Sequence, residues 1–113
     1  MVLVGGAANP ASADSSRILP AASVGDVVAD GVHKRVFISD PTSGKVLATD
    51  YSGNVVGTIP SLPGVTGLEL SADSGTLYAG VRGADAIAAI DTSALVESAR
   101  YATGADTEPA SAG

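Results

Sequence analysis

Two aspartates, one histidine and a few polar loop residues are the side chains with which this chain could do chemistry. Asp50 and Asp91 each end an apolar run, and each is followed two residues later by a serine, Ser52 or Ser93. Such a carboxylate could be a metal ligand or an acid–base group, but it more commonly forms an Asx turn by accepting from the amide two residues on. Because this pair occurs twice, whereas a catalytic carboxylate is needed once, we expect Asp50 and Asp91 to be structural turn residues.

His33 is the one histidine of the chain, and there is no cysteine. A site with two histidine ligands, a thiolate nucleophile, a disulfide and a cysteine zinc site are therefore all excluded within one copy. As a general base, His33 would need an orienting partner and a pocket. We expect an exposed loop histidine instead, and the sequence predicts no catalytic residue, no metal site and no cofactor.

The polar residues are carried by a repeat, which runs from Gly25 to Ile59 and again from Gly67 to Tyr101. The two copies of the aspartate give its step, 91 − 50 = 41 residues. A period of about 40–45 residues with four short strands in each unit is typical of the blades of a β-propeller. We therefore divide the chain into a leader (1–23), blade one (24–60), blade two (61–102) and a connector toward a further blade (103–113).

Each unit shows four apolar runs separated by turn residues, such as Pro41 to Gly44. The expected strands are Val24–Ala29, Arg35–Asp40, Lys45–Asp50 and Val55–Ile59, then Thr66–Ser71, Thr76–Gly80, Ala86–Asp91 and Leu95–Tyr101. The alanine content of 84–100 also allows a helix, but its β-branched residues and its place in the repeat favour strands. The predicted fold is all-β, an open fragment of a β-propeller made of two four-stranded antiparallel blades.

The repeat units resemble known propeller families. The stretch RVFISDPTSGKVLATDYSGNVV (35–56) is similar to the NHL pattern, although Ser43 to Val46 stand where that pattern has Asn-x-Arg-Ile. The stretch LSADSGTLYAGVRGADAIAAIDTSAL (70–95) is similar to the YVTN, or YncE-like, pattern, with Ala72 in place of the common proline. The resemblance implies a propeller that is often secreted or periplasmic. Its families include binding modules as well as lactonases and lyases.

The up-and-down order of the strands sorts the loops into two ends. The loops after the second and fourth strands of each unit share the end at which propeller ligands usually bind. The best-placed polar residues at that end are Asp40, Thr42, Arg82 and Asp85, which we take as candidate ligand-binding residues. The alternative is that they are ordinary solvated loop positions.

The net charge limits the classes of partner that we expect, and the N-terminal residues indicate where the protein is located. The formal net charge is −6, which has the wrong sign for non-specific binding to nucleic acid or to an anionic membrane surface. No apolar run approaches the ~18 residues of a membrane-spanning helix. Residues 1–13 end in Ala11-Ser12-Ala13, an A-x-A pattern typical of signal-peptide cleavage. We therefore expect a secreted or cell-envelope protein; a flexible leader is the alternative.

Two blades do not close a ring, because propellers usually have roughly 4–8 of them. The first blade is expected to lack a neighbour before Gly25 and the second to lack one after Tyr101, so apolar faces should seek partners. The expected partners are further blades, in the same chain or in other copies, and an unknown small molecule or protein. The predicted function is an extracytoplasmic binding or interaction scaffold. The alternative is a part of a lactonase- or lyase-type propeller enzyme whose site residues lie mostly on other blades.

Overall fold

The structure, a computed structural model, describes residues 2–4 and 17–103. Its strands are β1 (Val2–Val4), β2 (Arg17–Leu19), β3 (Val27–Asp30), β4 (Arg35–Asp40), β5 (Lys45–Asp50), β6 (Val55–Ile59), β7 (Val65–Leu70), β8 (Thr76–Val81), β9 (Ala86–Asp91) and β10 (Val96–Ala102). A single 3-10 turn, η2 (Arg82–Ala84), connects β8 to β9. Apart from this turn, the regular secondary structure of the described residues is therefore all β, as the sequence predicts.

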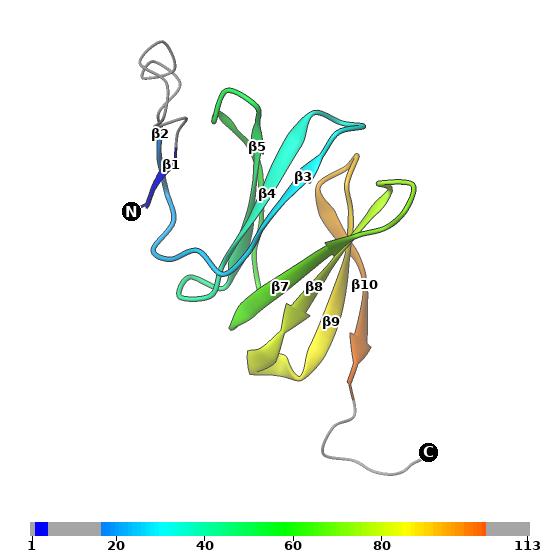
Figure 1. The fold of residues 1–113 in the computed structure, drawn as a ribbon. Coiled ribbons are helices and arrows are strands. Elements are labelled where there is room, and N and C mark those ends of the chain that lie inside the picture. Colours follow the sequence, from blue (N-terminus) through cyan, green and yellow to red (C-terminus); the bar gives the residue numbers. More distant parts are fainter. Residues whose placement is uncertain (1, 5–16, 104–113) are drawn as a thin grey trace.

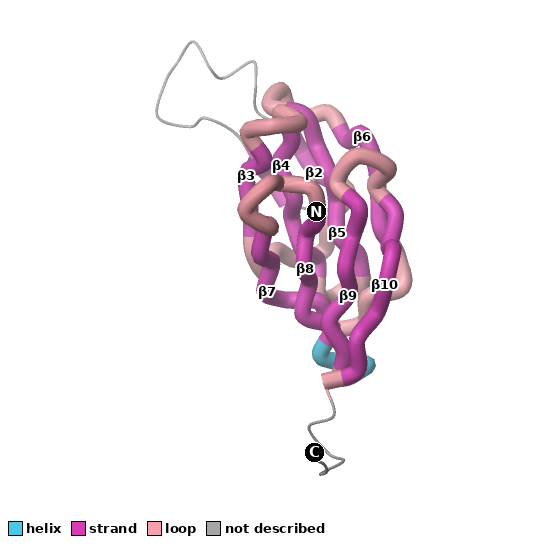
Figure 2. The backbone as a smooth tube through the Cα atoms, turned by 90° about the vertical axis from the view of Figure 1, so that its right-hand side faces the viewer, coloured by secondary structure: helices cyan, strands magenta, loops and turns pink. Residues whose placement is uncertain are grey.

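The strands form two four-stranded antiparallel sheets, which are the two blades. Blade one has the strand order β3-β4-β5-β6 and blade two the order β7-β8-β9-β10. Strands β4 and β8 start 41 residues apart (76 − 35 = 41), and the same step relates β5 to β9 and β6 to β10. Figure 2 looks onto blade two, with its four strands side by side in front of blade one.

The central strands of blade one are buried on both faces. On β4, Phe37 faces blade two, whereas Ile38 faces the opposite side, and both are almost completely buried. On β5, Leu47 lies on the same outer side as Ile38. Strands covered on both faces carry continuous apolar runs rather than an alternating pattern, and RVFISD and KVLATD have that character.

The main hydrophobic core lies between the two blades. Its buried members are Phe37, Val46, Ala48 and Ile59 of blade one, Leu62 of the segment between β6 and β7 (60–64, which we call the linker), and Val65, Leu68, Leu77, Ala79, Val81, Ala88 and Ile90 of blade two. Two hydrogen bonds cross from blade one to β7 beside this core. Ser39 Oγ donates to the Thr66 carbonyl at 2.6 Å, and the Leu68 amide donates to Asp26 Oδ2 at 2.9 Å.

The outer face of blade one is covered by the residues that precede it, so the expectation of a bare first blade is wrong. Leu19 of β2 and Ala21 of the segment between β2 and β3 pack against Ile38 and Leu47, and Leu19 and Ala21 are each only 2% exposed. Strand β2 pairs with β1, and Figure 1 shows this pair beside blade one, on the side away from blade two. The molecule therefore has three successive layers, which are the β1–β2 pair, blade one and blade two.

The strand boundaries agree closely with the expected ones, and the strands over 84–100 exclude the helical alternative. The largest difference is at β3, which begins at Val27 and not at Val24. The Gly25 amide does donate to the Ser39 carbonyl at 2.8 Å, but the residues before it follow a different path, held by the Asp40 side chain. The connector predicted for 103–113 lies outside the described residues after Thr103, and so does the A-x-A pattern.

Candidate functional site

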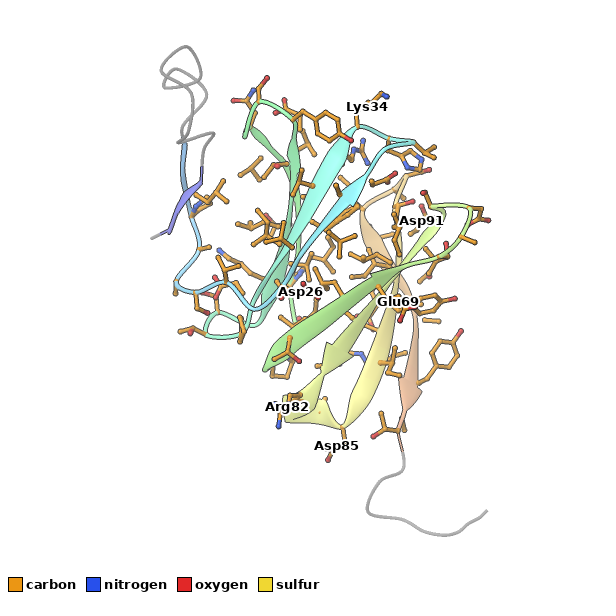
Figure 3. The ribbon with its side chains drawn as sticks, in the orientation of Figure 1. Asp26, Lys34, Glu69, Arg82, Asp85 and Asp91 are labelled. Carbon is orange, nitrogen blue, oxygen red and sulfur yellow. The ribbon has the colours of Figure 1, made fainter. Side chains whose placement is uncertain are left out.

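Arg82 and Asp85 lie together at one end of blade two, where β8 turns into β9. They border an open hollow of about 350 Å³, lined by Gly80, Val81, Arg82, Asp85, Ala86, Ile87 and Thr103. The turn is held by the carbonyl of Asp85, which accepts bonds from the Thr103 amide at 2.8 Å and the Thr103 hydroxyl at 3.0 Å. Figure 3 shows both charged side chains at this end. Neither forms an ion pair within the described residues, so a ligand could meet both charges.

Asp40 and Thr42, the other two candidate residues, belong to the turn between β4 and β5 and do not line this hollow. The Asp40 carboxylate is fully buried and accepts hydrogen bonds from the amides of Ala22, Ser23 and Ser43 at 2.9–3.2 Å, and from the Ser23 hydroxyl at 3.0 Å. Thr42 is exposed, and its amide donates to the same Ser23 hydroxyl at 3.1 Å. Asp40 therefore anchors the segment between β2 and β3, before blade one.

The environment of Asp40 favours its charged form. Burial alone would raise the pKa of this carboxyl, but the donors from Ala22, Ser43 and Ser23 outweigh burial and lower the pKa to about 2. Of the four candidates, Arg82 and Asp85 thus have the more accessible geometry, and ligand binding at any of the four stays a prediction.

Asp50 and Asp91 make the side-chain contacts that an Asx turn requires. Asp50 Oδ1 accepts from the Ser52 amide at 2.9 Å, and Asp91 Oδ1 accepts from the Ser93 amide at 2.8 Å. Asn54 donates further bonds to Asp50 from its amide and its side chain. These bonds stabilise the charged carboxylates, and the pKa of each aspartate is lowered from its ordinary value, by Asn54 first for Asp50 and by the Ala94 and Ser93 amides for Asp91.

A third arrangement, Asp30–His33–Ser93, joins the two blades at the opposite end of the molecule and is not among the features predicted from the sequence. His33 Nδ1 lies 2.7 Å from Asp30 Oδ2, and His33 Nε2 lies 3.2 Å from Ser93 Oγ. His33 lies in the loop between β3 and β4, as expected, but the expectation of an exposed side chain is wrong: it is only 25% exposed, and its partner Asp30 is fully buried. The spacing Asp-x-x-His in one turn could have indicated the first contact, whereas Ser93 is 60 residues away along the chain.

Among the described residues, large side chains on the outer face of blade two are exposed. The positions that alternate with the core-facing ones on β8 and β9 lie on this face: Tyr78, Gly80, Ile87 and Ala89, of which Ala89 is itself buried. We call these four residues the open face. Tyr78 and Ile87 are 41% and 40% exposed, and a shallow hollow of about 240 Å³ lies over this part of the sheet, bordered by both residues. Figure 2 views the molecule from this side.

No family model and no curated protein matches the chain. Among solved structures, it is similar to the hydrazine synthase of Kuenenia stuttgartiensis, a β-propeller-containing protein, with 20% identity and a TM-score of 0.61 over 66% of this chain. The chain spans 22% of the length of that protein chain. The two sheets are propeller blades. At this identity the similarity extends to the fold alone, so it carries no statement about activity.

Within the described residues, no group of three or more histidine, cysteine, aspartate or glutamate side chains is placed to hold a metal ion. The same residues include no helix that is long and apolar enough to cross a membrane. The features left as candidates in the described part of the chain are the hollow at Arg82 and Asp85, the Asp30–His33–Ser93 contacts and the open face of blade two.

Proposed function

We propose that this chain is a β-propeller segment that acts as an extracytoplasmic binding or interaction scaffold, and that the open face of blade two receives a further blade. The NHL-like and YVTN-like resemblance of the two units supports a place outside the cytoplasm. The hollow at Arg82 and Asp85, which shares Gly80 and Ile87 with the open face, offers a binding place for a small molecule or a protein loop. The proposal rests on one observation: the residues of the open face stand one 41-residue repeat after the residues of blade one that face blade two.

Blade one presents Phe37, Ser39, Val46 and Ala48 toward blade two. A shift by the 41-residue repeat converts these positions into Tyr78, Gly80, Ile87 and Ala89, which are the open face. The same shift converts Val36, Ile38 and Leu47, on the covered outer side of blade one, into core residues of the interface between the blades. Each blade therefore has one face built to receive the blade after it.

The exposure of these positions supports the same conclusion. Phe37 and Val46 are completely buried under blade two, whereas their counterparts Tyr78 and Ile87 are exposed. Burial of such side chains contributes about 1.5–3 kcal/mol each, so an uncovered blade face gives a strong drive toward association. A sheet of the same kind, from a further blade or another copy of this chain, is the partner whose shape this face fits.

Sedimentation velocity over a concentration series tests the proposal. We expect the wild-type chain to form species larger than its 11.0 kDa monomer as concentration rises, and Ile87→Lys to shift the distribution toward the monomer. The matched control is Val32→Lys, because Val32 is an aliphatic residue that is more exposed (65%) but lies in the loop between β3 and β4. A wild-type chain that is monomeric throughout, or an Ile87→Lys variant that associates as strongly as Val32→Lys, would contradict the proposal.

A further inference from the structure

Asp30, His33 and Ser93 form a chain of contacts in which a buried carboxylate holds a histidine that in turn reaches a serine hydroxyl. The first contact, between Asp30 Oδ2 and His33 Nδ1, is 2.7 Å, and the second, between His33 Nε2 and Ser93 Oγ, is 3.2 Å. Both lie within the reach required of a nucleophile, its base and the group that orients the base. Lys34 and Asp91 mark this end of the molecule in Figure 3, away from Arg82 and Asp85.

The proton positions follow from the partners of the imidazole ring. Burial opposes ionisation of Asp30, but hydrogen bonds from the His33 amide, the His33 ring and the Val32 amide outweigh burial and lower its pKa. The ionised carboxylate can only accept, so the proton of the neutral ring lies on Nδ1. The lone pair of Nε2 then faces Ser93 Oγ, which is the arrangement that a general base requires.

Thr92, the residue before Ser93, holds the turn to both blades by hydrogen bonds. Thr92 is fully buried, and its carbonyl accepts from Arg35 Nη1 at 2.7 Å, a bond that ties the turn to blade one. The Thr92 hydroxyl donates to the Ser74 carbonyl at 2.5 Å. Ser93 itself is exposed, so its hydroxyl is accessible to a reagent while its backbone is held in place.

We propose that Ser93 is a nucleophile, with His33 as its general base and Asp30 as the positioning residue, and that it accepts an acyl group from a small activated ester. In this step Oγ attacks the carbonyl carbon of the ester while Nε2 takes the hydroxyl proton. The bond from that carbon to the leaving group then breaks, and the leaving group departs as an anion. The acyl group stays on Ser93 as an ester.

The surroundings of Ser93 limit the reaction to activated donors. The amides of Ser93 and Ala94 donate to Asp91 Oδ1 at 2.8 and 2.9 Å, so they are not free to stabilise an oxyanion. The ionised carboxylate of Asp91 beside them also disfavours negative charge on the reacting carbonyl oxygen. We therefore expect a stable adduct with a good acyl donor and no sustained hydrolysis of ordinary esters.

Ser52 provides an internal control. It stands 41 residues before Ser93, in the equivalent turn, is exposed, and its amide donates to Asp50 Oδ1 at 2.9 Å in the same way. No histidine bonds to it, because the one histidine of the chain is held between Asp30 and Ser93. A difference in reactivity between the two serines therefore reports on His33 and not on the turn.

The test treats the whole chain with p-nitrophenyl acetate and measures acetylation of each serine by peptide mass mapping. A general base contributes roughly 10²–10⁴ in rate, so we expect Ser93 to react on the order of 100-fold faster than Ser52. His33→Ala should remove this difference, and free imidazole should restore it at Ser93 alone. Asp30→Asn should slow the reaction, because an amide can donate to Nδ1 and would turn the proton toward Ser93.

Circular dichroism and thermal melts show whether each variant is folded. Equal rates at Ser52 and Ser93 in the wild-type chain would overturn the proposal without any variant, so it stays testable if His33→Ala does not fold. A folded His33→Ala that acetylates Ser93 at the wild-type rate would overturn it too. The result does not depend on the open face, which lies elsewhere on blade two.

Discussion

At the scale of single residues, one chemical device recurs at strand ends in both blades. Asp30, Asp40, Asp50 and Asp91 each stand at the last residue of a strand and accept backbone amide hydrogens from the turn that follows. Such bonds satisfy amides that the ladder leaves free and favour the ionised carboxylate. The aspartates differ in what else they contact, and those additional contacts join distant parts of the chain.

Asp40 gives a stability prediction with a defined pH range. Its pKa is about 2 in the folded chain against an ordinary value of 3.8. Because the folded-state pKa is the lower one, the stabilisation is fully present above about pH 4 and is lost as the pH falls toward 2. This difference corresponds to on the order of 2 kcal/mol. We expect Asp40→Asn to lower the free energy of unfolding at pH 6 and to flatten its fall between pH 4 and 2, as measured by urea unfolding.

Ser23→Ala is the graded control for this experiment, because it removes one of the donors to Asp40 and leaves the carboxylate. Like Asp40→Asn, it should flatten the fall in the free energy of unfolding between pH 4 and 2, but by a smaller amount. An Asp40→Asn variant with the wild-type dependence on pH would show that the segment between β2 and β3 does not rely on this carboxylate.

The residue contacts that could be predicted are the local ones. The bond from the amide of Ser93 to Asp91 follows from a spacing of two residues and from turn chemistry. The donors to Asp40 include Ala22 and Ser23, which lie 18 and 17 residues before it, and no pattern in the sequence pairs them. The contact between His33 and Ser93 has the same cause, because it exists only once blade two is packed against blade one.

At the scale of elements, hairpins were predictable because each strand is paired with its neighbour along the chain. The bounds of β4, β5, β6 and β9 are those that the turn residues indicate. Gly44 illustrates the turn chemistry: its φ is +68°, a region that favours glycine, and its carbonyl accepts from the Leu62 amide at 2.8 Å. The linker between the blades is thus fixed to the turn between β4 and β5, which no local pattern indicates.

Gly83 in η2 gives a prediction about the contact between η2 and the linker. A Cβ atom at Gly83 would lie 2.9 Å from both the Pro63 carbonyl oxygen and the Pro63 Cβ, so the backbone of the linker would have to shift. We expect Gly83→Ala to lower stability by roughly 1–3 kcal/mol, the usual cost of overpacking, as measured by urea unfolding.

Gly31→Ala is the matched loop variant, because a Cβ there meets nothing within 4 Å. It should be neutral or slightly stabilising, since alanine restricts the unfolded chain. Equal effects of the two substitutions would show that η2 and the linker are not in the close contact described.

At the scale of the whole molecule, the repeat step explains how the layers follow one another. The apolar runs of β4 and β5 belong to a blade covered on both sides, and the alternating burial of β8 belongs to a blade covered on one. The 41-residue step in the sequence was sufficient to predict two stacked blades. It could not show that Leu19 and Ala21 cover blade one, because these residues precede the repeat and have no counterpart pattern within it.

The open face of blade two corresponds, one 41-residue repeat later, to the face of blade one that packs against blade two. The most direct test extends the chain by one unit, with a second copy of residues 62–102 placed after residue 102 so that the 41-residue step continues. The tyrosines of the added copy are changed to phenylalanine. Tyr78 then reports on the open face, and Tyr51, which is 56% exposed in the turn after β5, is the internal control.

The measurement is the rate at which tetranitromethane nitrates each tyrosine, with and without the added unit. We predict that nitration of Tyr78 slows strongly in the extended chain while that of Tyr51 is unchanged, because Tyr78 takes the fully buried position of Phe37. Unchanged nitration of Tyr78 in an extended chain whose added unit is folded would contradict the account.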